Sequence, residues 1–340
     1  MRGFTLIEVM VSLAIGAFIA VASLTLTGEQ LRVLDLTESR VSMSQEGRSA
    51  MELIAKDVRS AGLGVGYQAD GTFAGLRRGV FSVAGGASFQ ADDFDVGNGL
   101  LTDDLGLRFT RGDVRTISDY NQGTGQVCAG GMFSEDELVL LMSRNGRTAN
   151  SARILSANPD AGVGTVCVDG CETFTFVWDS TYSTDAGAQT ATYDEGELFG
   201  DFQEVVYFAT PDPVSGLSTL RRARIDTSEP CTSRSADCGV VVGVNIEAIQ
   251  TRLWMFDEAS QGWTDVTTDG DITEVTQLRL DVELVMRADS ASDARERPVA
   301  SALENGLCYP AGCGGEGDGR LRQILRSSID IRNAGRMQIR

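Results

Sequence analysis

The first residue placed to do chemistry is Glu8, which stands at the edge of an apolar run from Val9 to Leu26. The run holds neither a charge nor a proline. At about 1.5 Å per residue it is long enough to cross a hydrocarbon core roughly 30 Å thick. A charged side chain in such a core costs about 2.5–3.5 kcal/mol on insertion scales, so a plain membrane anchor leaves Glu8 unexplained.

Most enzyme chemistry is excluded by what the chain lacks. It has no histidine, which rules out Ser–His and Cys–His nucleophile pairs and the common His-ligated metal sites. Its one lysine, Lys56, follows no Gly-rich loop, so a Walker-type phosphate loop is also ruled out. Carboxylate pairs are too numerous to nominate a hydrolase. We therefore predict no enzymatic activity, no cofactor and no metal site.

Three short motifs have simpler explanations than a binding site. Arg111-Gly112-Asp113 spells an integrin-type tripeptide, but three residues recur easily by chance. The glycines between Gly62 and Gly66 lack the strand–helix order of a dinucleotide loop and favour a helix cap. Asp93, Asp95 and Asn98 have calcium-like spacing without the EF-hand pattern, which favours an acidic turn.

The cysteines indicate disulfides in an oxidising compartment. The chain has seven: Cys128, Cys167, Cys171, Cys231, Cys238, Cys308 and Cys313. They form three couples close in sequence (167/171, 231/238 and 308/313), and none has the paired CxxC spacing of a zinc ribbon. If the last two couples close locally, one cysteine is left over among Cys128, Cys167 and Cys171, and the spacing does not decide which.

Composition describes a globular, acidic chain. Its 340 residues suggest one large domain or two ordinary ones, with 42% apolar and 23% charged residues. Asp and Glu number 48 against 29 Lys and Arg, a net charge of -19. Such a surface repels phosphate backbones, so we expect no nucleic-acid binding.

Glu8 must be positioned by a helix that continues past the membrane edge. No proline occurs between Glu29 and Ala61, Glu52 and Lys56 form a favourable i,i+4 pair, and glycines follow. The pattern predicts one helix from Phe4 to Ala61, about 85 Å long, with a transmembrane half at about 9–26 and an amphipathic half that packs under a head.

Flanking charges orient this helix. Arg2 precedes the apolar run and Glu29 follows it, which places the N-terminus in the cytoplasm and the rest outside the inner membrane. A secretory signal peptide cut after Ala20-Val21-Ala22 is the alternative. It does not need Glu8, and the helical pattern runs through the supposed cut.

Past Gly66 the periodicity changes from helical to alternating. The clearest strand is Gln277–Arg287, where apolar and charged residues face opposite sides. Further predicted strands are Glu137–Ser143, Phe202–Thr210, Leu217–Ile225, Ile249–Phe256 and Leu325–Arg332. No repeat or clean linker divides this region. We predict one α+β head, residues 62–340, with an antiparallel sheet and long loops.

The first residues resemble a known signature. Gly3-Phe4-Thr5-Leu6-Ile7-Glu8 is similar to the type IV prepilin motif, in which a prepilin peptidase cuts after the glycine and methylates the new N-terminus. The resemblance implies a leader of residues 1–3 and a mature chain that begins at methylated Phe4. It also implies that the Glu8 carboxylate pairs with the Phe4 ammonium of a neighbouring subunit and so sets the register of assembly.

The resemblance extends along the chain. The segments MELIAKDVRSAGLG, SEDELVLLMS, NIEAIQTRLWMFD, DITEVTQLRLDVELVMR and RQILRSSIDIRN follow the order seen in PilW-like minor pilins. This implies the type IV pilin fold and a subunit that helps initiate or cap a type IV pilus, in a machine for twitching motility. Its partners would be minor and major pilins and the inner-membrane assembly platform, and its location the inner membrane, then the pilus at the cell surface.

Two other functions remain open. A J-type minor pseudopilin of the type II secretion system has a comparable layout, and the head could instead be a ligand-binding adhesin displayed on the pilus. The region from Ser151 to Gly200 departs most from the PilW-like pattern, so the resemblance implies nothing about its loops.

Overall fold

A computed structural model describes the fold. It covers residues 6–65, 73, 75–77, 94–95, 100–121, 123, 125–130, 133–144, 148–157, 172–183, 193–211, 217–225, 237–265, 277–291, 299–300, 302, 308–309 and 320–331.

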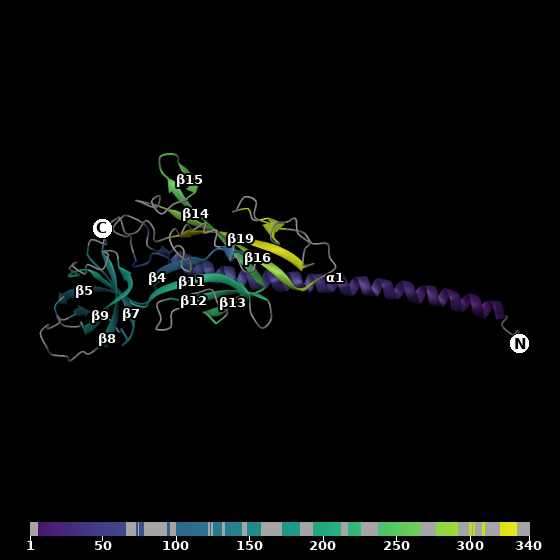
Figure 1. Ribbon diagram of the computed structural model, residues 1–340, viewed down its shortest axis with the longest axis horizontal. Coiled ribbons are helices and arrows are strands. Elements are labelled where there is room, and N and C mark those ends of the chain that lie inside the picture. Colours follow the sequence, from purple (N-terminus) through teal and green to yellow (C-terminus); the bar gives the residue numbers. More distant parts are fainter. Residues whose placement is uncertain are drawn as a thin grey trace.

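A single long helix, α1 (Leu6–Ser60), forms the axis of the molecule (Figure 1). This confirms the predicted long N-terminal helix, which ends one residue before the predicted Ala61, while its predicted start at Phe4 lies outside the described residues. The helix ends in a turn in which Gly62 (φ 80°) and Gly64 (φ 75°) adopt the left-handed conformation that glycine accepts without strain. Its side chains are exposed up to the point where the head begins, and Met43 is the first buried residue.

Two antiparallel sheets enclose the second half of α1. One has the strand order β1-β4-β11-β12-β13 and the other β15-β14-β16-β19. The strands of the first are β1 (Leu76–Arg77), β4 (Leu105–Thr110), β11 (Phe202–Pro211), β12 (Ser218–Arg224) and β13 (Val240–Val244). Those of the second are β14 (Ile246–Asp257), β15 (Gly262–Asp265), β16 (Leu278–Ala291) and β19 (Arg320–Ile331). Apolar side chains of both sheets and of α1, among them Ile54, Tyr207 and Leu280, form one core.

A closed six-stranded barrel lies beyond the end of the helix, at the far end of the molecule from the N-terminus (Figure 1). Its strand order is β10-β5-β6-β9-β8-β7. The strands are β5 (Val114–Asn121), β6 (Gln126–Ala129), β7 (Leu138–Met142), β8 (Ala149–Ala157), β9 (Glu172–Ser183) and β10 (Glu197–Phe199). The barrel has an aromatic core of its own, including Phe174, Phe176 and Tyr193. It is inserted between β4 and β11.

Two short hairpins complete the described strands: β2 (Phe94–Asp95) with β3 (Leu100–Leu101), and β17 (Val299–Ala300) with β18 (Cys308–Tyr309). The predicted long helix and β-rich head are confirmed, and all six predicted strands are present. The arrangement differs from the single sheet that we expected, because the head contains two sheets and a barrel. All strand pairs among the described residues are antiparallel.

Candidate assembly site

The first half of α1 is an apolar surface with nothing packed on it. Leu13, Phe18 and Leu24 are 70%, 77% and 73% exposed. By length and hydropathy α1 is able to span a membrane, and none of its most apolar window is buried in the chain itself. Each Å² of such a surface left in water forgoes about 25 cal/mol of stabilisation, so this half requires lipid or other apolar helices around it.

Exposed apolar residues continue past the predicted span. Leu31, Val33 and Leu34 are 58%, 61% and 63% exposed, although they lie beyond Leu26 and before the head begins. The part of α1 between the predicted span and the head therefore also offers an apolar surface.

Glu8 is exposed in the first turn of the described helix. A carboxylate there lies close to the positive end of the helix dipole, which favours its charged form by roughly 0.3–1 kcal/mol. The Ser12 hydroxyl donates a hydrogen bond to the Glu8 backbone carbonyl at 2.7 Å. Gly3 and Phe4, the predicted cleavage and methylation residues, lie outside the described residues.

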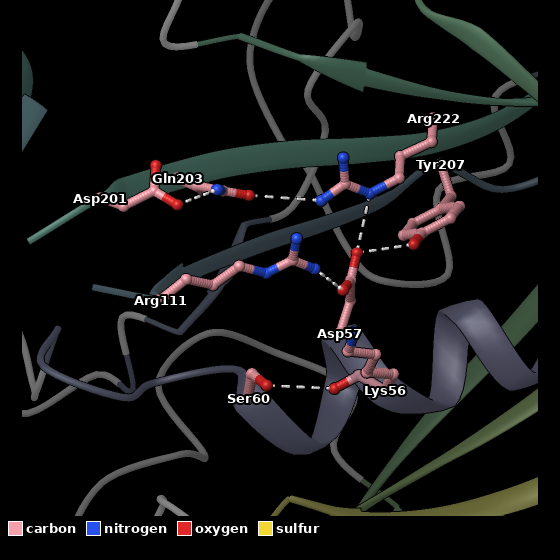
Figure 2. A network of polar contacts seen from close by, with 8 residues as sticks. All are labelled: Lys56, Asp57, Ser60, Arg111, Asp201, Gln203, Tyr207 and Arg222. Carbon is pink, nitrogen blue, oxygen red and sulfur yellow. Dashed lines mark hydrogen bonds and ion pairs between the residues drawn. The ribbon is translucent and has the colours of Figure 1, made fainter. Parts of the chain in front are cut away.

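The second half of α1 carries a different carboxylate, Asp57, which sequence analysis did not single out. It is completely buried. Arg222 Nε donates to its Oδ2 at 2.8 Å, the Tyr207 hydroxyl donates to the same oxygen at 2.7 Å, and Arg111 pairs with Oδ1 (Figure 2). The donors come from β12, from β11 and from the segment that follows β4. One helix side chain thereby joins three parts of the head.

A pattern in the sequence could have revealed Asp57. It occupies the same helix face as Ala50, Ile54 and Ala61, at the i, i+3, i+4 spacing of a buried stripe. An aspartate in such a stripe requires donors from elsewhere in the fold, because an unpaired buried charge is costly.

The network extends toward the barrel. Arg222 also donates to the Gln203 side-chain oxygen at 3.4 Å, and Gln203 donates to Asp201 at 2.6 Å (Figure 2). Asp201 lies where the chain returns from the barrel, and Arg111 lies where it leaves β4. The Asp57 network therefore touches both connections to the barrel.

Burial and the neighbouring charge keep Tyr207 protonated. Burial raises the pKa of the Tyr207 hydroxyl far above its ordinary value, and the charge and hydrogen bond of Asp57 raise it further. For Arg222, burial alone would lower the pKa, but the hydrogen bond and charge of Asp57 outweigh that effect and raise it. Both groups remain donors over the physiological pH range.

The integrin-type tripeptide has a structural role. The Arg111 side chain pairs with buried Asp57, and Gly112 packs so closely on the return segment that an added Cβ would lie 2.6 Å from the Gly200 carbonyl carbon. Gly112 N–H also donates to the Gly200 carbonyl at 3.0 Å. Arg111 is thus committed to a contact inside the protein.

The N-terminus of the chain is similar to a known family of segments. Residues 1–24 match the prokaryotic N-terminal methylation motif. The N-terminal segment of the chain therefore carries the prepilin methylation motif. This motif implies interaction with a prepilin peptidase and with pilins, and together with the long apolar helix it indicates a membrane-anchored chain.

The head has no comparably specific match. No curated protein matches the sequence. Among solved structures, a type IV-like pilin from Thermus thermophilus matches at 16% identity over 59% of this chain and 87% of that chain. The TM-score is 0.21, which is too low to support an argument about the head of this chain.

The cysteines are described in part. Cys128 and Cys238 are buried and both are disulfide-bonded. Cys167, Cys171, Cys231 and Cys313 lie outside the described residues, as does the side chain of Cys308, so the predicted pairing of the couples remains a prediction. In the calcium-like stretch, Asp93 and Asn98 lie outside the described residues, as does the side chain of Asp95, so the predicted acidic turn also remains a prediction. Among the described residues, no group of three or more acidic or cysteine side chains could hold a metal ion.

Proposed function

We propose that this chain is a minor pilin that helps to initiate or cap a type IV pilus. The observation that carries the proposal is the division of α1: a head encloses its second half, and its first half presents Glu8 and an apolar surface that the chain itself leaves bare. In a filament, the apolar surface of this half would be buried against the helices of other subunits.

Glu8 would act after processing. A cut between Gly3 and Phe4 creates an α-ammonium, and methylation keeps its positive charge. Among packed apolar helices, the ammonium of one subunit and the Glu8 carboxylate of its neighbour attract strongly, while either charge alone is costly to bury. Subunits then align at the offset where the two charges meet. In this role Glu8 sets register and takes part in no reaction.

The size of the head supports a place at the end of a filament. Two sheets and a barrel surround and extend α1, which makes the head bulky relative to the helix that must pack in the filament core (Figure 1). A bulky head is hard to repeat at close axial spacing, whereas a tip or an initiating complex needs only one copy. The subunit would pass from the inner membrane, with its head in the periplasm, to the cell surface.

Mass spectrometry of the mature N-terminus tests the processing step. We expect a chain that begins with methylated Phe4, and a chain that begins at Ser23 would show secretion by a signal peptide instead. For assembly, Glu8→Gln should leave membrane insertion intact and remove the subunit from filaments. Glu29→Gln, at the other end of the apolar run, is the matched control. Equal incorporation of both variants would contradict the role of Glu8.

The distal barrel favours a second candidate function, that of a displayed adhesin. It lies farthest from the membrane-spanning half and has its own core. This function predicts that loop substitutions in the barrel abolish binding to a surface and leave piliation unchanged. Loss of pili on deletion of the gene would favour the assembly role. The same helix would also serve a J-type pseudopilin, and co-purification with pilus or with secretion components separates these two.

A further inference from the structure

The buried face of α1 does not by itself specify one packing arrangement. Where the helix lies between the sheets, this face consists of apolar residues, of which three are small (Gly47, Ala50 and Ala55), two are methionines (Met43 and Met51) and two are β-branched (Ile54 and Val58). Apolar burial is non-directional, and methionine adapts to irregular gaps. A helix with such a face, shifted by one turn, would still bury apolar residues against apolar residues.

Asp57 removes this ambiguity. It is the one charged residue of α1 that is buried, and its carboxylate meets donors from three separate segments. A shift by one turn would carry the carboxylate away from Arg111, Tyr207 and Arg222, leaving buried charges without partners. The penalty is specific to register, in the way that a single buried polar residue fixes the alignment of a coiled coil.

The turn after the helix provides a second, weaker restraint. Gly62 N–H donates to the Arg108 carbonyl at 2.9 Å, and Thr110 N–H donates to the Leu63 carbonyl at 3.1 Å. The Thr110 hydroxyl donates to the same Leu63 carbonyl at 3.1 Å. These bonds fix the backbone of the turn, which contains two glycines with positive φ. They therefore restrain the chain after the helix, whereas Asp57 restrains the helix itself.

We propose that Asp57 is a positioning residue that fixes the register of α1 against the head. Because α1 is continuous from Leu6 to Ser60, its register at Asp57 also sets the direction in which Glu8 and the exposed apolar residues point relative to the head. This consequence for assembly rests on the proposed function. The register itself does not depend on that function.

An engineered disulfide reports the register directly. A Cβ built on Gly243 of β13 lies 3.3 Å from the Ala50 Cβ, close to the spacing that a disulfide needs. The nearest atom to it is the terminal methyl of Ile246, a buried core side chain that must change its rotamer to admit the new side chain. The pair A50C/G243C therefore reports the native register. The pair E46C/G243C reports a helix shifted by one turn, because Glu46 precedes Ala50 by four residues.

The experiment uses the full-length chain in detergent micelles, oxidised and digested, with the cross-linked peptides measured by mass spectrometry. In the parent chain we expect the A50C/G243C link and little of the E46C/G243C link. With Asp57→Leu we expect the first link to fall on the order of threefold or more and the second to rise. Thr110→Val, which removes the hydroxyl bond to Leu63 and leaves Asp57 intact, should retain the parent pattern.

Two results would overturn the proposal. One is an unchanged pattern of links in a folded Asp57→Leu chain, with native circular dichroism. The other is an equal loss of the native link in Thr110→Val, which would assign the register to the turn. Asp57→Asn, which keeps the shape and one acceptor oxygen, provides a milder variant that should shift the links in the same direction by less. The cross-links are measured in the isolated chain and do not depend on filaments. The register can therefore be tested even if the proposed function in pilus assembly is wrong.

Discussion

The two carboxylates Glu8 and Asp57 lie on the same helix in opposite environments. Glu8 is exposed near the start of α1, whereas Asp57 near its end is completely buried and held by two arginines and a tyrosine. The interactions of Asp57 are complete when the chain folds. Those proposed for Glu8 form only when a second subunit arrives. A carboxylate thus stabilises the fold at one end of the helix and, in the proposed function, the assembly at the other.

The largest expected effect separates these two carboxylates. Asp57→Ala removes the carboxylate that three donors share. Because the mostly buried guanidinium of Arg222 then lacks this partner, the free energy of unfolding should fall by about 3–5 kcal/mol. Urea unfolding followed by tryptophan fluorescence measures this change. Glu52→Ala, on the exposed face of the same helix segment, should change it by less than about 0.5 kcal/mol. Similar losses in both variants would mean that Asp57 contributes only helix propensity.

Two isoleucines, one in each half of α1, test whether only the second half contributes to the stability of the head. Ile54 is fully buried and Ile15 is 56% exposed. Ile54→Ala should lower the free energy of unfolding of the head by about 2–5 kcal/mol, because it loses apolar burial and leaves a cavity. Ile15→Ala should leave that quantity unchanged in detergent. If it destabilises the head to a similar extent, the first half of the helix folds against the head in solution.

Tyr207→Phe examines one bond of the network and its pH dependence. At neutral pH the loss of a hydrogen bond to a charged group should cost about 1.5–3 kcal/mol. Burial and then Asp57 raise the folded-state pKa of Tyr207 above the ordinary value of 10.0. Its contribution is therefore complete below pH 10 and is lost as the pH rises above 10, where the unfolded chain gives up its proton first. The variant should show a shallower alkaline decline than the parent chain.

Some alkaline decline should remain in that variant, because burial also raises the pKa of Tyr182. An identical decline in the variant and the parent would show that Tyr207 does not contribute to it.

The smallest effect comes from two helix glycines. An added Cβ at Gly16 meets nothing within 4 Å, whereas at Gly47 it would lie 2.2 Å from the sulfur of Met286. Alanine gains about 0.5–1 kcal/mol of helix stability at either site. Since crowding against Met286 offsets that gain, Gly47→Ala should lower the free energy of unfolding of the head by roughly 0–2 kcal/mol. Gly16→Ala should leave it unchanged, and a reduced incorporation of that variant into filaments would locate Gly16 in a helix–helix contact.

The sequence predicted the long helix and the strands with regular alternation. Gln277–Arg287 became β16 (Leu278–Ala291), and its alternating apolar residues form the face that joins the core with α1. The opposite face is only partly exposed, since Glu283 and Val285 on it are buried. The barrel was overlooked, since β5 and β8 carry mixed polar residues with no clear period. A signal existed in β9, where Phe174, Phe176 and Trp178 recur at every second residue.

The site was predictable to a similar degree. Glu8 is conspicuous because it stands beside a run with no other charge. Asp57 lies among many scattered charges, and its role depends on Arg111, Tyr207 and Arg222, which are distant in the sequence. Local patterns describe which face of a helix is buried, whereas the choice of donors for a buried group is decided by the tertiary fold.

The connection between sheet and barrel has a consequence for how such proteins diversify. The chain leaves β4 at Thr110 and returns at Phe202, and these two residues are direct partners in the β4–β11 ladder. A tight turn in place of the barrel would leave that ladder intact. The barrel is therefore an insertion at one point of the sheet, and natural variation or design could exchange it without changing the β4–β11 pairing, provided that the new module also covers Val65, which packs on the barrel.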